Sequence, residues 1–285
     1  MPSAPFSVPL PDDVTLAGTR GGRPGGPAVV LLHANVADRR SWRIVFDRLD
    51  GDGFDLVAYD RRGFGATPLG EEDFTHVEDL EAVLDAAEAE RALLVGNSMG
   101  GAVALDLALT QPERVAGLLL LGAGASGMTD EGEELTYEVD PASGRILGAL
   151  KEAEQREDVD ETIRLLAHLW LDGPTSPEGR VGGGARQLFA EMNRRILAVG
   201  APDEAGDAGL DAWHELGEIQ APGIAAWGDL DQPADLPWYR LMADRLPRVT
   251  GRELPGVAHL PSLEQPQTVA ALVREVAASL RSGSS

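Results

Sequence analysis

The chain contains no cysteine and a single lysine, Lys151. Without cysteine it has no disulfide bonds, no thiol nucleophile, no iron–sulfur cluster and no zinc site with cysteine ligands. Residues 1–6 lack the basic and apolar regions of a signal peptide, and no apolar run approaches the length that spans a bilayer. We therefore expect a cytoplasmic protein.

Basic residues as a whole are few. The chain has 24 lysines and arginines against 47 aspartates and glutamates, which gives a net charge of −23. Such a surface repels nucleic acid and anionic lipid. Hydrophobic residues make up 43% of the 285 positions, enough for a sizeable core. We expect a globular protein that acts on a small molecule, as a monomer or homodimer, with neither nucleic acid nor a membrane as partner.

Short, continuous apolar runs recur along the chain between turn residues, at 28–32, 56–59, 92–95, 115–121 and 223–227. Their continuity predicts strands buried on both faces, as in a parallel sheet. Weaker alternating patterns at 14–17 and 249–254 predict edge strands. Helical patterns at 41–49, 76–89, 99–110 and 264–280 lie between the runs. This alternation predicts a doubly wound α/β fold.

The alternation breaks between about residues 128 and 216. This stretch has helical segments near 143–157, 160–171 and 185–199, separated by glycine and proline joints, and no convincing strand. We interpret residues 1–127 and 217–285 as the core and residues 128–216 as a helical cap, or lid, inserted into it. Ordinary packing helices without a gating role are the alternative.

Ser98 is the candidate nucleophile. It lies in Gly-Asn-Ser-Met-Gly at residues 96–100, between a predicted buried strand and a predicted helix. A serine on such a tight turn needs small residues two positions away on both sides, and the turn lifts its hydroxyl to the end of the sheet. It also directs the backbone N–H of Met99 toward a developing oxyanion.

A serine hydroxyl needs a base within hydrogen-bond reach. Among the five histidines, His259 follows the last predicted strand and precedes the last helix, so its loop can lie beside Ser98. His33 also follows a strand, but its neighbours indicate an oxyanion loop. The other candidates are His76 at a helix start, and His168 and His214 in or near the insertion.

The acid is expected between the serine and the histidine in chain order. Asp229 and Asp231 both follow the predicted strand at 223–227. Asp231 is preferred because it lies one turn residue further from the strand, and Asp229 remains the alternative. Residues 122–127, after the strand at 115–121, offer no competing acid.

Motifs between about residues 29 and 266 resemble the α/β-hydrolase superfamily. Residues 31–35 resemble its His-Gly-x oxyanion loop, with Trp42 at the usual distance, and residues 60–65 resemble its Asp-x-Arg-Gly-x-Gly loop. Residues 228–231 resemble Gly-x-x-Asp, which again indicates Asp231, and residues 257–266 resemble the histidine loop. The resemblance implies the α/β-hydrolase fold: a mostly parallel sheet flanked by helices, with an inserted helical cap.

The resemblance also implies that the backbone N–H of Asn35 is the second oxyanion donor. Ala34 departs from the pattern, because the family usually has glycine there. If that position needed a backbone geometry open only to glycine, the oxyanion hole would be shaped differently. Asn97 before the serine resembles the C–C bond hydrolases, although the His33 loop lacks their additional glycines.

Two patterns that could indicate a cofactor or a metal lack the necessary context. Residues 122–127 fit Gly-x-Gly-x-x-Gly after a predicted strand, but a helical insertion follows instead of the βαβ unit of dinucleotide-binding proteins. The acidic clusters at 130–134 and 152–161 are typical of solvated helix faces. We expect no cofactor and no metal.

These residues together predict a serine hydrolase that cleaves an uncharged, small to mid-sized ester or lactone through an acyl-enzyme intermediate. Ser98 is the nucleophile, His259 the base and Asp231 the residue that orients it. The alternatives are C–C bond hydrolysis, cofactor-free oxygenation or perhydrolysis with the same triad, and a hydrolase-like ligand sensor with little turnover. The cap contains no motif that identifies the substrate.

Overall fold

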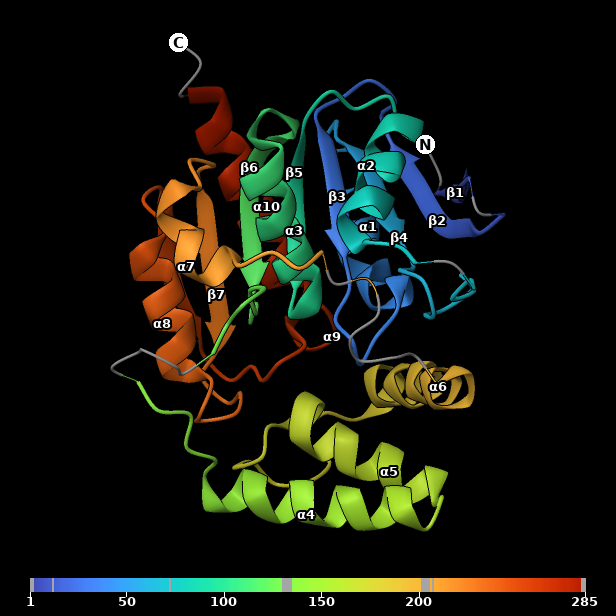
Figure 1. Ribbon diagram of the computed structural model, residues 1–285, viewed down its shortest axis with the longest axis vertical. Coiled ribbons are helices and arrows are strands. Elements are labelled where there is room, and N and C mark those ends of the chain that lie inside the picture. Colours follow the sequence, from blue (N-terminus) through green and yellow to red (C-terminus); the bar gives the residue numbers. More distant parts are fainter. Residues whose placement is uncertain are drawn as a thin grey trace.

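An eight-stranded sheet runs through the computed structural model, which describes residues 3–11, 13–71, 73–129, 135–200, 206 and 208–282. The strand order is β1-β2-β4-β3-β5-β6-β7-β8 (Figure 1). The strands are β1 (Ala4–Pro9), β2 (Thr15–Gly22), β3 (Ala28–Leu32), β4 (Asp55–Tyr59), β5 (Ala92–Asn97), β6 (Val115–Leu121), β7 (Gly223–Gly228) and β8 (Val249–Leu254).

The sheet is mostly parallel, as the continuous apolar runs predict. From β4 through β8 each neighbouring pair is parallel, whereas β2 pairs antiparallel with both β1 and β4. The predicted edge strand at 249–254 is β8, which does lie at an edge. The prediction of an edge at 14–17 is wrong, because the unpredicted β1 pairs along the outer side of β2. The apolar and polar residues of β2 alternate because one face of this strand is covered, not because the strand lies at an edge of the sheet.

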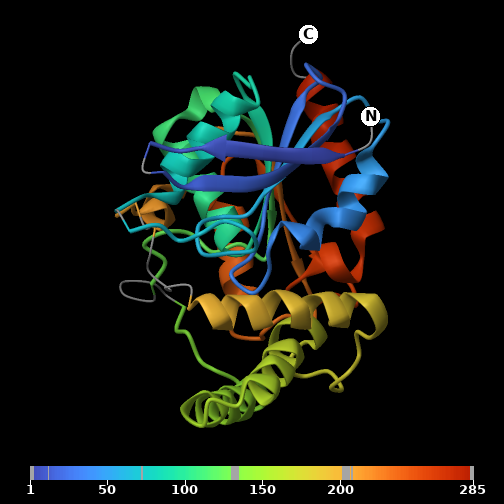
Figure 2. The ribbon, with the colours of Figure 1, turned by 90° about the vertical axis from the view of Figure 1, so that its right-hand side faces the viewer.

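Helices cover both faces of the sheet (Figure 2). On one face, α1 (Arg43–Leu49) and α10 (Pro266–Ser282) bury apolar side chains against the strands. On the other face, α2 (His76–Ala86), α3 (Met99–Thr110), α7 (Ala212–Glu215) and α8 (Leu236–Arg245) pack together. This arrangement confirms the predicted α/β class. The short helices are η1 (Arg39–Trp42), η2 (Pro112–Arg114), η4 (Leu216–Glu218) and α9 (Pro261–Glu264).

Four further elements form a separate layer beyond the carboxyl ends of the strands (Figures 1 and 2). They are α4 (Pro141–Gln155), α5 (Val159–Leu166), the π-helical η3 (Ala167–Asp172) that continues α5, and α6 (Gly183–Val199). We call them the cap helices. They stand between β6 and β7 in the chain, where a helical insertion is predicted. The domain boundaries at 128 and 216 stay a prediction.

Side chains at the helix starts explain where two of the cap helices begin. The Asp140 carboxylate accepts hydrogen bonds from the backbone N–H groups of Ala142 and Ser143, so it caps α4. Asp158 caps α5 in the same way through the N–H of Glu161. Across the described part of the chain, no helix has the length and apolar composition of a membrane span.

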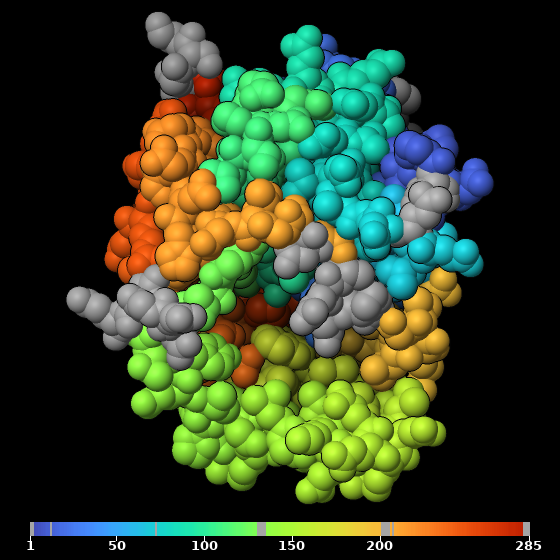
Figure 3. Space-filling view, in the orientation of Figure 1, coloured from blue at the N-terminus to red at the C-terminus, as the bar shows by residue number. Residues whose placement is uncertain are grey.

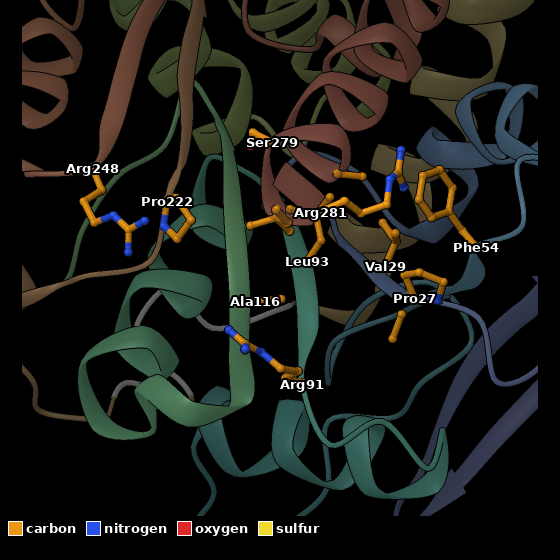
Figure 4. A pocket seen from close by; sticks show the side chains of 13 residues that line it. Pro27, Val29, Phe54, Arg91, Leu93, Ala116, Pro222, Arg248, Ser279 and Arg281 are labelled. Atoms are coloured by element: carbon orange, nitrogen blue, oxygen red, sulfur yellow. The ribbon is translucent and has the colours of Figure 1, made fainter. Parts of the chain in front are cut away.

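A cavity of about 680 Å³ opens at the amino ends of β3, β5 and β6 (Figure 4). Its floor is apolar, with Val29 and Leu93 among the lining residues, and its rim includes Arg91, Arg248 and Arg281. Because the predicted functional side chains come after the carboxyl ends of the strands, this cavity lies at the opposite end of the sheet from the candidate site.

Candidate active site

Ser98 lies on a strained turn between β5 and α3. Its backbone has φ 54° and ψ −121°, a conformation that few residues other than glycine adopt. A Cβ on Gly96 would collide with the carbonyl of Gly100, and one on Gly100 with the carbonyl of Leu32. The two glycines are therefore required by close backbone approach, as the predicted serine turn demands. Ser98 itself is half-buried.

The carboxyl ends of four parallel strands bring the predicted residues to one edge of the sheet. Asn35 follows β3, Ser98 follows β5, Asp231 follows β7 and His259 follows β8. In open α/β sheets ligands bind at this edge. Met99 is the first residue of α3, so its backbone N–H has no acceptor within the helix.

Asp231 and His259 form a buried pair. His259 Nδ1 donates to Asp231 Oδ2 at 2.7 Å, and their side chains are 6% and 0% exposed. The same oxygen accepts from the Tyr239 hydroxyl at 3.1 Å, and Asp231 Oδ1 accepts from the backbone N–H of Gln232 at 2.8 Å. Asp229 instead accepts from the backbone of Gly256. The structure thus brings Asp231, and not Asp229, to the histidine.

The hydrogen bond to Asp231 fixes the imidazole tautomer. With its proton on Nδ1, neutral His259 keeps the Nε2 lone pair free to accept a proton. Burial lowers the pKa of His259, but the charge and hydrogen bond of Asp231, with smaller effects of Asp235 and Glu264, leave it raised above its usual value. Burial, and then the charge of Asp231, raises the pKa of Asp235 to about 6.

Asn97 connects the serine turn to the histidine loop. Its side-chain amide donates to the carbonyl of His259 at 3.0 Å and to that of Leu121 at 2.8 Å. The backbone N–H of Ser98 also binds the Leu121 carbonyl, at 3.0 Å. Within the described residues the Ser98 hydroxyl makes no hydrogen bond, and bonds of this kind often tighten only when substrate binds.

The other histidines have different surroundings. His168 contacts the carbonyl of Ser176, and the exposed His214 contacts Asp211. His33 and His76 are buried beside Arg61, and burial followed by the charge of Arg61 lowers the pKa of both imidazoles, to about 2 for His76. The Nε2 atoms of both imidazoles already contact Arg61, at 3.0 Å from its backbone N–H for His33 and at 3.2 Å from its guanidinium for His76, so neither is directed toward Ser98 as a base.

Ala34 adopts an ordinary backbone conformation. It is absent from the described non-glycine residues with positive φ, so the position does not require glycine. Its side chain is buried in an apolar cluster with the cap residues Phe189 and Met192. The departure from the family pattern therefore replaces hydrogen with a methyl group that packs against the cap.

The cap helices contact the site directly. The Trp170 ring lies 4.6 Å from the His259 ring, centroid to centroid, and the Trp170 carbonyl accepts from the backbone N–H of His259 at 3.2 Å. On α6, Asn193 donates to the carbonyl of Val36 at 2.9 Å. The sequence alone leaves Trp170 undecided between core and pocket, because its facing partner is distant in the chain.

Space for a ligand lies between the cap helices and the core, where the surface in Figure 3 is hollowed. A cavity of about 540 Å³ is lined by Met128, Thr129, Tyr137, Asp235 and Trp238. Since the charges of Asp231 and His259 act on Asp235, this cavity adjoins the buried pair.

No group of three or more metal-ligating side chains is gathered within the described ranges. The acidic cluster predicted at 130–134 lies outside the described residues. The cluster at 152–161 falls on the end of α4 and the start of α5.

Residues 29–272 match the profile of the alpha/beta hydrolase family. The chain is 27% identical over 216 residues to a 2-hydroxy-6-oxononadienedioate/2-hydroxy-6-oxononatrienedioate hydrolase of Paraburkholderia phymatum, covering 73% of this chain and 72% of that one. It is 26% identical over 287 residues to the rhodomycin D methylesterase DauP of Streptomyces sp. strain C5, covering 92% and 94%. The crystal structure of the esterase RhEst1 from Rhodococcus sp. ECU1013 superposes with a TM-score of 0.77 at 25% identity, covering 98% and 100%.

Proposed function

Because this chain belongs to the alpha/beta hydrolase family, we propose that it is a serine hydrolase that cleaves an uncharged carboxylic ester or lactone through an acyl-enzyme intermediate. The observation that carries the proposal is the buried bond of 2.7 Å between His259 Nδ1 and Asp231 Oδ2, held next to the strained Ser98 turn by Asn97. This arrangement suits a base that must accept a proton from a serine hydroxyl.

In the proposed mechanism, Ser98 Oγ attacks the carbonyl carbon while His259 Nε2 takes the hydroxyl proton. The backbone N–H groups of Met99 and Asn35 bind the resulting oxyanion. The tetrahedral intermediate collapses, the bond to the alcohol oxygen breaks, and His259 gives its proton to that oxygen. Asp231 stabilises the imidazolium throughout.

Water completes the reaction. His259 removes a proton from the water as its oxygen attacks the acyl carbon bound to Ser98. The second tetrahedral intermediate releases the carboxylic acid, and the proton returns from His259 to Ser98 Oγ. A lactone is cleaved by the same steps, except that the alcohol and the acid remain in one product.

An uncharged substrate is supported by the net charge of −23 and by ion pairs that occupy several arginines of the core and the cap. An arginine bound to a carboxylate is not available to a substrate anion. The pairs are Arg180 with Glu264, Arg186 with Asp172, Arg39 with Asp60, Arg40 with Asp38 and Arg62 with Asp79.

C–C bond hydrolysis is the second candidate, and the similarity to the Paraburkholderia hydrolase supports it. The substrates in the name of that relative are dioates, which carry two carboxylates. The paired arginines and the acidic Asp231 and Asp235 beside the site favour the neutral ester. Oxygenation, perhydrolysis and ligand sensing with little turnover stay alternatives that product analysis on an ester panel would separate.

The location in the cytoplasm, the lack of nucleic-acid or membrane partners, and the monomeric or homodimeric state stay predictions. So does the division into a core and a cap at residues 128 and 216. The net charge of −23 supports the exclusion of anionic partners.

A fluorophosphonate probe tests the proposal without knowledge of the substrate. We expect the wild-type protein to be labelled, with the modified peptide containing Ser98. Ser98→Ala should lose labelling and ester hydrolysis while keeping its thermal midpoint. Ser279→Ala, on α10, is the matched control and should be labelled like the wild type. Ester hydrolysis that persists in Ser98→Ala would overturn the assignment.

A further inference from the structure

Arg61 is a buried arginine without a carboxylate partner. Its residue is 1% exposed, and its guanidinium contacts the side chains of Asn35, His76 and Phe64. Within the described part of the chain it makes no ion pair, and its Nε has no hydrogen-bond acceptor. An unpaired buried charge is costly, so its retention needs an explanation.

The two residues next to Arg61 in the chain both form ion pairs. Asp60, the preceding residue, pairs with Arg39, and the next residue, Arg62, pairs with Asp79 at 2.9 Å. Burial lowers the pKa of Arg61 to about 10, so it is still protonated at neutral pH. Burial and the charge of Arg61 lower the pKa of His33 and His76, and an imidazole carries no negative charge in either protonation state, so neither residue offsets the charge of Arg61.

Arg61 binds the oxyanion loop at three points. Its Nη2 donates to Asn35 Oδ1 at 2.6 Å and to the carbonyl of His33 at 3.4 Å. Its backbone N–H donates to His33 Nε2 at 3.0 Å. This places the imidazole proton of His33 on Nδ1, which donates to the carbonyl of Ala34 at 2.8 Å. Residues 33–35 are thus held by one arginine.

We propose that Arg61 is the positioning residue of the oxyanion hole, and this rests on the proposed function. It fixes the loop that presents the backbone N–H of Asn35. Its charge, which no carboxylate of the described residues neutralises, favours the negative charge that develops at the loop in the transition state.

Arg61→Met removes the charge and keeps an apolar chain of similar length. We expect kcat for an ester to fall about ten- to a hundredfold, which is less than the loss of about a hundred- to a thousandfold on removal of a direct oxyanion donor, while KM changes little. Affinity for a trifluoromethyl ketone, which forms a tetrahedral oxyanion adduct with a serine, should fall in parallel. The thermal midpoint should fall less than in a variant that leaves a buried carboxylate unpaired, because removal of an unpaired buried charge offsets the loss of the hydrogen bonds to Asn35 and His33.

Arg62→Met is the matched control. Arg62 is also buried, but its loss leaves the Asp79 carboxylate without this partner. We expect a lower thermal midpoint and an unchanged kcat per folded molecule. A residue with only a structural role would behave like Arg62. We therefore expect Arg61→Met to lose mainly kcat and Arg62→Met to lose mainly stability.

Asn35→Asp changes the side chain that accepts the hydrogen bond from Arg61, and so tests the same inference. The substitution keeps the shape of the side chain and gives Arg61 a carboxylate at 2.6 Å spacing. The new pair should raise the thermal midpoint, and the added negative charge should lower both kcat and the affinity for the ketone.

The outcomes separate this inference from the proposed function. A wild-type protein that is neither labelled at Ser98 nor active on esters would overturn the proposed function, and the role of Arg61 with it. A labelled, active wild type combined with unchanged kcat and ketone affinity in Arg61→Met would overturn only the role of Arg61. A lower thermal midpoint with unchanged kcat in Asn35→Asp would also overturn the role of Arg61 without affecting the proposed function.

Discussion

The side-chain amide of Asn97 binds the carbonyl of His259 at 3.0 Å, although 162 positions separate the two residues. Asn97 immediately precedes Ser98, so one amide fixes the spacing between the serine turn and the histidine loop. Its second bond, to the carbonyl of Leu121, holds the turn against β6. Asn97 is therefore a structural part of the site rather than evidence for one reaction type.

Asn97→Ala should lower both stability and activity. It leaves the carbonyl of His259 without this partner, whereas the carbonyl of Leu121 keeps the backbone N–H of Ser98, so we expect a loss of about 1–3 kcal/mol for one unsatisfied group. We also expect kcat to fall, because the histidine loop is no longer tied to the Ser98 turn. Chemical denaturation and ester kinetics measure the two effects. Thr110→Ala is the control. It removes the hydrogen bond from the Thr110 hydroxyl to the backbone carbonyl of Asp106 on α3 and should leave kcat unchanged.

Asp231→Asn should lower kcat by about a thousandfold or more, because the imidazolium loses its counter-charge and the tautomer is no longer enforced. Asp229→Asn is the control, since the Asp229 carboxylate lies at the same turn but accepts from the backbone N–H of Gly256 instead of from His259. Kinetics with one ester compare the variants. Equal losses in both would show that Asp231 has no special role.

The pH dependence of kcat should report His259. Its pKa is raised above the usual value, and only the neutral imidazole accepts a proton, so activity should fall as pH drops through that raised pKa. Asp235→Asn removes one charge that raises this pKa, so the fall should move to lower pH. A pH–rate profile that is identical in both proteins would contradict this account.

The same titration has a defined effect on stability. Because the folded protein binds this proton more tightly than the unfolded chain, the contribution is fully present below about pH 6.5 and is lost as pH rises through the folded-state pKa. Denaturation of the wild type and of His259→Gln across this window measures it. The variant should lack this component of the pH dependence.

The buried strands could be predicted because their signal is local. Continuous apolar runs locate β3 and β6 at their observed limits. The sequence does not predict β1 and α8, whose short apolar patterns are interrupted by prolines. Pro5 and Pro9 fall on an edge strand, and Pro237 stands in the first turn of a helix, positions where proline is tolerated.

Chain order and the positions of the strand ends predict one part of the candidate site. Those features bring Ser98, Asp231 and His259 together. The parts contributed by Arg61 and Trp170 depend on contacts between segments that are distant in the chain, and no local pattern encodes them. The sequence motif containing Arg61 predicts a loop, but not which of its arginines lacks a carboxylate.

Trp170 should control the environment of the base. Its ring lies against His259, and burial lowers the pKa of that imidazole. Trp170→Ala removes the ring but keeps the backbone bond to His259, so the imidazole becomes better solvated. The acid fall of the pH–rate profile should then move to higher pH, opposite to the effect of Asp235→Asn.

Trp170→Phe is the matched variant, because a smaller ring still covers the imidazole. Its pH profile should stay close to that of the wild type. If the indole served only to anchor the cap helices, both variants would lower the thermal midpoint and neither would move the profile. A shift in Trp170→Ala alone, with its sign opposite to that of Asp235→Asn, would link the cap to the protonation of His259, the proposed base.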